Sequence, residues 1–389
     1  MTTNKVPQIR FKEFSGEWNN ENLGKLANFS KGQGYSKNDL VEDGKPIILY
    51  GRLYTKYQAV ISKVDTYVKE QQNSILSKGN EVVVPASGET AEEIARASAI
   101  KTPNLLIGGD LNIIYPNNEI DNSFLALNIS NGRTQKNLSK KAQGKSVVHL
   151  RNNDLKEIDL FYPYKDEQIK IGDYFHQLDK LIEQKEKKYQ KLKQFKKAML
   201  DKMFPKNGAD TPEIRFKGFS GKWEEKKLGD IFNYERPDNY IVKSTEYSND
   251  NKTPVLTANK AFILGYTNEL NTFNKPSIIF DDFTLDFKFV DFPYMVKSSA
   301  LKILTINDEK KDSLIFIYNL LHTIKIEIMG HARHYIGVVQ PTNVFVPKIE
   351  EQIKIGSYFQ KLDNQIDLQQ KELEKLKNIK KASLAKMFV

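Results

Sequence analysis

The chain has 389 residues, no cysteine and a formal net charge of +10 at pH 7, with 39% hydrophobic and 11% aromatic residues. This length allows two or three domains with cores of their own, and the lack of cysteine excludes a disulfide framework, thiolate metal sites and a cysteine nucleophile. Without a long apolar run or an apolar amino terminus, we expect no membrane span and no secretory signal, and we expect a protein of the reducing cytoplasm. The charge indicates a polyanionic partner, unless it reflects a generally lysine-rich proteome.

The chain begins with a segment that it later repeats. Pro7 to Trp18 read PQIRFKEFSGEW, and Pro212 to Trp223 read PEIRFKGFSGKW, so that nine of twelve positions are identical. A second repeat links residues 166–204 to residues 350–388, which agree at 22 of 39 positions. We interpret the chain as a tandem duplication whose two copies have similar ends and dissimilar middles.

Each dissimilar middle predicts a mixed domain. The first, residues 27–165, has apolar strand signals at 45–51, 80–88 and 111–118, a short helical turn at 91–97 and a closing strand before Pro163. The second, residues 232–349, has strand signals at 253–260, 275–283 and 299–307, a helix at 312–325 and a closing strand before Pro347. Gly, Pro and Asn bound these runs, as is typical of strands. We expect two α+β domains of similar topology.

The repeated closing segments predict long helices. Acidic residues stand in the first turns, and apolar residues then recur with the spacing of a heptad seam. A helix of 39 residues is about 58 Å long, so we expect the two helices to pair with each other; the alternative is that each lies on its own domain. The predicted pairing residues are Ile171, Phe175, Leu178, Ile182, Tyr189, Leu192 and Met199, with Ile355, Phe359, Leu362, Ile366, Leu373 and Leu376.

These elements predict a division of the chain into five parts. They are a first domain at 1–165, a long helix at 166–204, a connecting loop at 205–211, a second domain at 212–349 and a second long helix at 350–389.

Catalytic motifs are missing from the sequence. It has no GxxxxGK(S/T) phosphate loop, and KGQGYSK at 31–37 is more typical of a turn. HARH at 331–334 lacks the spacing of a metal site, and the acids of FDDFTLDFK at 280–288 have no counterpart in the other copy. The Asn/Asp-Pro-Pro-aromatic tetrapeptide of adenine methyltransferases is also missing. We therefore predict no catalytic residues, no metal site and no enzyme acting alone.

Basic and aromatic residues interleave in several segments, which favours contact with nucleic acid. Residues 130–151 hold six cations and no acid, and we expect them to form a loop that approaches phosphates; the alternative is a solvated flexible loop. Arg333 suits a guanine edge and Asn259 suits adenine. The candidate DNA-binding residues are Lys31, Arg52, Tyr54, Lys56, Arg133, Lys136, Lys140, Lys141, Lys145, Asn259, Lys260, His331, Arg333, His334 and Tyr335.

The whole pattern resembles the specificity subunits of type I restriction–modification systems, and is most similar to members from low-GC Gram-positive bacteria. The residues that carry the resemblance are the repeated IRF–F–G–W lead-ins, the closings at Pro163, Glu167 and Gln168 and at Pro347, Glu351 and Gln352, and the QIKIGxYFxxLD helix starts. The resemblance implies two target-recognition domains, each followed by a long helix. It also implies that the helices pair as an antiparallel coiled coil, with internal pseudo-two-fold symmetry, and act as a ruler.

The resemblance further implies a function and a set of partners. Each domain reads one half of a split, asymmetric site in double-stranded DNA. Two modification (methyltransferase) subunits bind the chain, and restriction (translocase and nuclease) subunits join them. No cofactor binds this chain itself; the assembled complex uses S-adenosylmethionine, ATP and Mg. A basic coiled-coil scaffold or adaptor is the alternative from another class, but it does not explain two diverged domains with basic loops. A remnant of a fused methyltransferase would need a catalytic domain for which the chain has no room.

Overall fold

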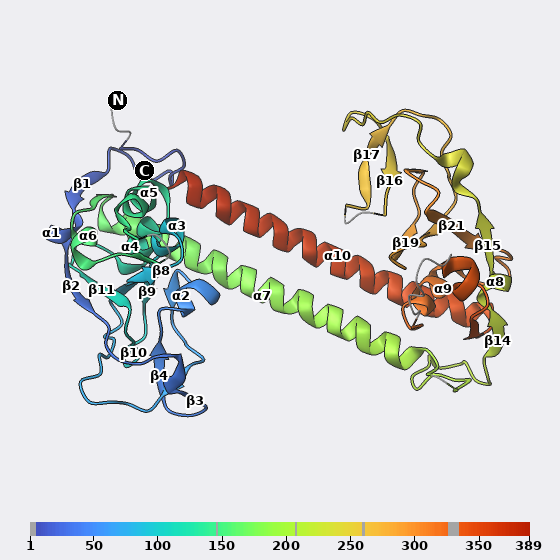
Figure 1. Ribbon diagram of the computed structural model, residues 1–389, viewed down its shortest axis with the longest axis horizontal. Coiled ribbons are helices and arrows are strands. Elements are labelled where there is room, and N and C mark those ends of the chain that lie inside the picture. The colour runs from blue at the N-terminus through green and yellow to red at the C-terminus, as the bar shows by residue number, and fades with distance from the viewer. Residues whose placement is uncertain (1–4, 145–146, 207, 259–260, 326–333) are drawn as a thin grey trace. The chain divides into compact units, whose positions relative to one another are not determined.

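Two long helices, α7 (Lys165–Met203) and α10 (Ile349–Lys386), dominate the computed structural model (Figure 1). The structure describes residues 5–144, 147–206, 208–258, 261–325 and 334–389. It forms two units, one of Met1–Glu186 with Lys371–Val389 and the other of Lys187–Gln370. Each unit therefore contains one mixed domain, the first half of the helix that follows it and the second half of the other helix. No described helix is long and apolar enough to cross a membrane.

The first unit is built on an antiparallel sheet with one parallel edge. The sheet has five strands, in the order β2 (Ala27–Lys31), β11 (Leu111–Pro116), β7 (Val82–Pro85), β9 (Ser98–Ile100) and β5 (Val60–Ile61), the last pairing parallel to β9. A smaller sheet has the order β10 (Leu106–Ile107), β4 (Lys45–Ile48), β6 (Tyr67–Val68) and β3 (Leu40–Val41). Two further pairs are β1 (Asn19–Asn22) with β13 (Asp159–Tyr162) and β8 (Ser87–Gly88) with β12 (Val148–His149).

Short helices cover this unit. They are α1 (Leu23–Leu26), α2 (Arg52–Thr55), α3 (Ala91–Ile94), α4 (Asn122–Ile129), α5 (Gly132–Lys141) and α6 (Asn152–Lys156), with a 3-10 turn at Lys37–Asp39. Every residue of α4 is buried, because this helix lies in the middle of the core. The predicted strands and the helical turn at 91–97 are confirmed.

The second unit repeats the central part of this plan. Its four-stranded sheet has the order β15 (Phe232–Glu235), β21 (Leu301–Ile306), β18 (Ser277–Asp281) and β19 (Phe287–Val290). A three-stranded sheet has the order β17 (Ile263–Thr267), β16 (Thr253–Leu256) and β20 (Met295–Val296), and β14 (Glu224–Lys227) pairs with β22 (Asn343–Val346). The helices are α8 (Leu228–Ile231) and α9 (Leu314–Leu321), with a 3-10 turn at Pro237–Tyr240 and a π-helical turn at Tyr335–Val339. The predicted pair of α+β domains is thus confirmed.

The two long helices run antiparallel where they meet within each unit. In the first unit, Asp179 pairs with Lys380, Lys185 with Glu372 at 2.5 Å, and Glu186 with Lys377 at 3.0 Å. In the second, Lys196 pairs with Asp363 at 2.5 Å. Residue numbers rise along α7 as they fall along α10, which is the antiparallel order. Lys185, Lys196 and Lys380 are therefore each paired with a carboxylate on the opposite helix.

The predicted pairing residues differ in what they contact. Ile171, Phe175, Ile355 and Phe359 are buried in the hydrophobic cores of the domains. Further along the helices, Leu178, Leu362 and Leu373 are buried, whereas Ile182, Tyr189, Leu192, Met199, Ile366 and Leu376 are half-buried. Away from the domain cores, the opposite helix thus covers some of the seam residues fully and others only in part.

An aromatic junction joins each domain to the end of the helix from the other copy. In the first unit, Phe388 lies 5.9 Å from Phe124 and 6.1 Å from Phe175, measured between ring centroids, and Phe124 lies 5.7 Å from Trp18. The second unit repeats this arrangement with Phe204, Phe316, Phe359 and Trp223. The first domain therefore completes its core with residues from the end of α10, and the second with residues from the end of α7.

In each copy, an arginine of the repeated lead-in forms an ion pair with a glutamate in the first turn of the long helix. We call these two ion pairs, Arg10 with Glu167 and Arg215 with Glu351, the clasp. Nε and Nη2 of Arg10 donate to the two carboxylate oxygens of Glu167 at 2.7 and 2.6 Å, and Nη1 donates to the carbonyl of Gly16 at 2.5 Å. Arg215 makes the matching contacts with Glu351 and Gly221. The repeated Arg, Gly and Glu thus serve the fold.

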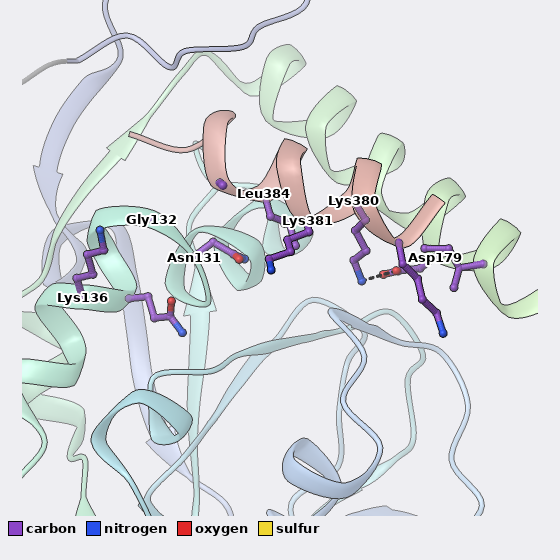
Figure 2. Close-up of a pocket in the computed structure, with 11 residues that line it drawn as sticks. Asn131, Gly132, Lys136, Asp179, Lys380, Lys381 and Leu384 are labelled. Carbon is purple, nitrogen blue, oxygen red and sulfur yellow. Dashed lines mark ion pairs between the residues drawn. The ribbon is translucent and has the colours of Figure 1, made fainter. Parts of the chain in front are cut away.

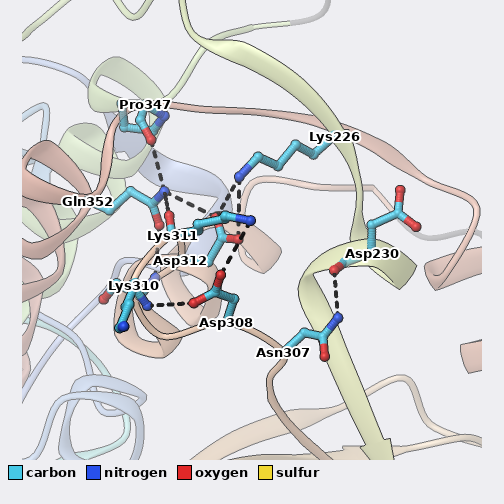
Figure 3. A network of polar contacts seen from close by, with 10 residues as sticks. Lys226, Asp230, Asn307, Asp308, Lys310, Lys311, Asp312, Pro347 and Gln352 are labelled. Carbon is cyan, nitrogen blue, oxygen red and sulfur yellow. Dashed lines mark hydrogen bonds and ion pairs between the residues drawn. The ribbon is translucent and has the colours of Figure 1, made fainter.

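The repeated glutamine after each glutamate ties the helix to the domain core. Gln168 accepts a hydrogen bond from the backbone N–H of Asp121 at 2.9 Å and donates to the carbonyl of Pro163 at 2.8 Å. Gln352 contacts Ser313 and Pro347 in the same way, and it also donates to Asp312, which pairs with Lys226 at 3.2 Å (Figure 3). These buried amides therefore fix the angle at which each long helix leaves its domain.

Candidate nucleic-acid interface

The first predicted contact segment, residues 50–58, holds its cations in internal contacts. Arg52 Nη1 lies 2.6 Å from Asp65 Oδ1, and Lys56 bonds to the other oxygen of the same carboxylate. Hydrogen bonds from Lys56 and from Arg52 lower the pKa of Asp65 to about 2. Tyr54 donates its hydroxyl to the carbonyl of Ser87 at 2.8 Å. The three candidates Arg52, Tyr54 and Lys56 thus hold α2 and the residue after it against neighbouring segments. Their contact with DNA stays a prediction.

A cavity of about 470 Å³ lies beside Tyr54, and the sequence alone did not identify it. Its lining includes Tyr50, Ser87, Glu89 and Glu93. Both glutamates are exposed. Carboxylate oxygens accept hydrogen bonds from the exocyclic amino group of cytosine in the major groove. The cavity is thus a candidate base-reading surface that includes two carboxylates, a type of side chain absent from the candidates predicted from the sequence.

Part of the predicted loop at 130–151 is a helix, which corrects the sequence-based expectation. Gly132–Lys141 form α5, because Thr134 and Leu138 are buried on one side of it and Leu138 joins the core. Lys31, Arg133, Lys136 and Lys140 are exposed. Arg133 also stacks over the ring of Phe161 at 5.1 Å, and Lys141 pairs with Glu157 at 2.6 Å. Lys145 lies outside the described residues.

The first unit places α5 beside the end of α10, and together they form a basic groove of about 590 Å³ (Figure 2). The lining includes Asn131, Lys136 and Lys381, together with the ion pair between Asp179 and Lys380. More than 240 residues separate Lys136 from Lys381 in the chain. No local pattern predicts that these cations meet, because their proximity depends on the aromatic junction that seats the end of α10.

Four of the six candidate DNA-binding residues in the second domain, Asn259, Lys260, His331 and Arg333, lie outside the described residues. His334 and Tyr335 are described, and both are buried, with 2% and 0% of their surface exposed. The Nδ1 atom of His334 lies 2.8 Å from the carbonyl oxygen of Asp282, and the backbone N–H of Tyr335 donates to the carboxylate of Asp282 at 2.7 Å. The core of the second unit encloses both side chains, so a direct contact of either with DNA stays a prediction that this burial does not support.

The acids of residues 280–288 serve the fold as well. Asp281 and Asp282 are buried, and both carboxylates accept hydrogen bonds from their own unit. Within the described parts of the chain, no three histidine or carboxylate side chains cluster so that they could hold a metal ion.

Comparisons with known proteins agree on one family. The family model for the type I restriction modification DNA specificity domain matches residues 15–194 and again residues 220–378. The type I restriction enzyme EcoR124I/EcoR124II specificity subunit of Escherichia coli is 42% identical over 126 residues, which are 31% of this chain and 31% of that protein. The putative type I restriction enzyme MjaX specificity subunit of Methanocaldococcus jannaschii is 24% identical over 298 residues, covering 71% of this chain and 70% of that protein.

A solved structure agrees at the level of the fold. The type I restriction–modification system S subunit from M. genitalium aligns over 99% of both chains, with a TM-score of 0.70 and 19% identity. Its likeness extends over both domains and both long helices of this chain. The two family matches together cover most of the 389 residues and repeat with the duplication. The chain belongs to the family of type I restriction–modification DNA specificity proteins, and carries two copies of their DNA specificity domain.

Proposed function

We propose that this chain is the DNA-recognition subunit of a type I restriction–modification complex and has no catalytic activity of its own. Each of its two domains reads one half of a bipartite, asymmetric site in double-stranded DNA. Two modification subunits and the restriction subunits bind to it. S-adenosylmethionine, ATP and Mg serve the assembled complex and are not bound by this chain.

One observation carries this proposal, which is the contrast between the two copies. The clasp, the glutamine and the aromatic junction recur residue for residue, while the candidate reading surfaces differ. In the first domain the cavity beside Tyr54 is lined by Glu89 and Glu93, whereas the cavity that follows the equivalent strand β18 of the second domain is lined by Thr284 and Lys288. A split and asymmetric site requires this combination, since the support must be the same twice and the readers must differ.

The decisive experiment exchanges one reader. Residues 232–349 are replaced by the corresponding segment of another family member, and the methylated motif is read by methylation-aware sequencing of cells that also carry the modification subunit. We expect one half of the motif to change and the other half to stay, because the exchanged segment lies between the retained repeats. A motif that changes in both halves would contradict independent readers. If cells that carry the unaltered chain with the modification subunit show no methylation beyond that of cells without the chain, the proposed function itself is wrong.

Exposed apolar residues at matching positions support the docking of a partner that is present twice. Ile9, Ile169 and Ile379 in the first unit correspond to Ile214, Ile353 and Phe195 in the second, and all six are exposed by 39–54%. The buried residues that the two copies share stabilise the fold through the clasp and the aromatic junction. The exposed apolar side chains contribute little to the fold, so their recurrence needs another reason. Equivalent apolar positions on both units suit two equivalent protein partners.

We expect Ile169→Asp combined with Ile353→Asp to abolish co-purification of the modification subunit, and either change alone to leave one such subunit per chain. A charge at a desolvated contact cannot be solvated or paired there. Stoichiometry is measured by analytical ultracentrifugation. Leu368→Asp is the matched control, because Leu368 is 56% exposed and corresponds to the polar Gln184. Two modification subunits still bound to the double variant would refute docking at these isoleucines.

A further inference from the structure

The turn between β18 and β19 holds Phe283 in solvent, with 71% of its surface exposed. The turn is closed by two backbone hydrogen bonds, from Leu285 N–H to the Asp281 carbonyl at 3.0 Å and from Asp281 N–H to the Asp286 carbonyl at 2.8 Å. A single exposed apolar side chain needs no explanation by itself, and Leu270 in the same unit is 91% exposed. What distinguishes Phe283 is the construction of its turn.

Two buried aspartates fix this turn. Oδ1 of Asp281 accepts from the backbone N–H of Phe283 at 3.1 Å, and Oδ2 accepts from the Thr284 hydroxyl at 2.5 Å. Asp282 lies 3.6 Å from Lys302 and accepts from the Tyr335 N–H, so it ties the turn to β21 and to the π-helical turn. The position of Phe283 is therefore determined by neighbours on both sides.

The backbone of the turn is unfavourable for the residue that occupies it. Leu285 has φ of +61°, in the left-handed region that non-glycine residues seldom adopt, and its side chain is partly buried against the core. Such a conformation persists only where surrounding contacts impose it, and it is concentrated at functional sites. Here the imposed geometry has one clear result, which is a fixed backbone position from which the side chain of Phe283 is exposed to solvent.

We propose that the ring of Phe283 contacts DNA bases as an apolar wedge in the half-site read by the second domain. This inference rests on the proposed function. Phenylalanine is among the side chains that proteins insert at base steps, where the cost of unstacking depends on the base sequence. A turn whose backbone is already held suits this role, because the backbone loses little conformational freedom when the exposed ring contacts DNA.

The surroundings favour DNA over a protein partner. The turn lies in the variable segment, and the chain after the equivalent strand β7 reads ASGET, without an aromatic residue. A partner that binds both copies needs equal surfaces, whereas base readers must differ. A cavity of about 370 Å³ adjoins the turn, lined by Thr284 with Thr257 and Lys288 among others, which are side chains that can bond to bases or phosphates.

The test compares Phe283→Ala and Phe283→Leu with the unaltered chain, each assembled with its modification subunits. The DNA probe is a duplex that carries the motif methylated in cells, and a second set carries each single-base change in turn. We expect Phe283→Ala to lower the preference for the motif over its variants by about tenfold to a hundredfold, at one or two adjacent positions of one half-site. Phe283→Leu should retain part of it. Leu270→Ala is the matched control and should behave as the unaltered chain.

A second readout tests unstacking directly. 2-Aminopurine placed at the affected step should gain fluorescence on binding of the unaltered chain and not on binding of Phe283→Ala. Equal losses of affinity on all duplexes, an unchanged preference, or loss of the modification subunit from Phe283→Ala would each overturn the wedge. These results leave the proposed function intact, since that fails only if methylation of the motif does not require the chain. Thermal unfolding checks that the variants fold as the unaltered chain does.

Discussion

Replacing Phe388 by alanine is expected to destabilise the first unit by about 3–5 kcal/mol, the usual cost of removing a buried phenylalanine ring from a core. Phe388 is 6% exposed and lies against Phe124 and Phe175. The loss would fall on the first unit, although Phe388 stands at the end of the helix that follows the second domain. We expect amide hydrogen exchange to accelerate in α4, where every residue is buried.

The variant at each aromatic junction serves as the experimental control for the variant at the other. Phe204→Ala should destabilise the second unit instead, where Phe204 lies 5.3 Å from Phe316 and 5.8 Å from Phe359. Ile379→Ala, at an exposed position of α10, should change stability little. If Phe388→Ala left α4 protected and accelerated exchange in α9 instead, the assignment of the end of α10 to the first domain would be wrong.

Removing Arg10 alone should be about as harmful as removing the ring. Arg10→Ala leaves the carboxylate of Glu167, whose side chain is 2% exposed, without its bidentate partner. Breaking a buried ion pair in this way costs about 3–5 kcal/mol, whereas replacing both partners by apolar residues is often close to neutral. We therefore expect Arg10→Met combined with Glu167→Leu to be much more stable than Arg10→Ala, as measured by denaturant unfolding.

The repeat offers a built-in comparison for the clasp. Arg215→Ala should have an effect of similar size through Glu351, and Lys12→Ala, at an exposed position of the same repeated segment, should have almost none. A loss below about 1 kcal/mol for Arg10→Ala would be the value of a surface ion pair, and it would mean that water reaches Glu167.

The sequence predicted the local elements well, because they depend on local patterns. The apolar runs at 82–85, 111–116 and 301–306 are buried strands, and the acidic first turns at 166 and 350 begin the two long helices. The repeats predicted the duplication, and the heptad seam predicted the pairing of the helices. Each of these signals is contained within a few turns or strands of the chain.

The candidate site was harder to predict, because charge alone does not reveal partners. Arg52 and Lys56 look like free cations in the sequence, but both bond to Asp65, which lies in a separate loop. Residues 130–151 look like a loop because they are rich in polar residues, yet burial of Leu138 makes part of them a helix. Tyr335 looks like a surface aromatic beside histidines, and it is buried by the turn that Asp282 anchors. Each of these contacts joins two different elements, so it does not follow from the local pattern of either one.

The aromatic junction also has a consequence for synthesis on the ribosome. The first domain has all of its own strands and short helices once Tyr162 has been made, but its core lacks Met387 and Phe388 until the whole of α10 has been made. The 184 residues between Phe204 and Phe388 take roughly 10–40 s to translate at bacterial rates. During that time the nascent chain carries an open aromatic pocket together with Met203 and Phe204, the same residue types that fill it. Two nascent chains on neighbouring ribosomes would thus expose complementary surfaces, the open pocket of one chain and Met203 with Phe204 of the other. Once the second domain has formed around Phe204, that ring is buried and can no longer enter the pocket of a neighbouring chain.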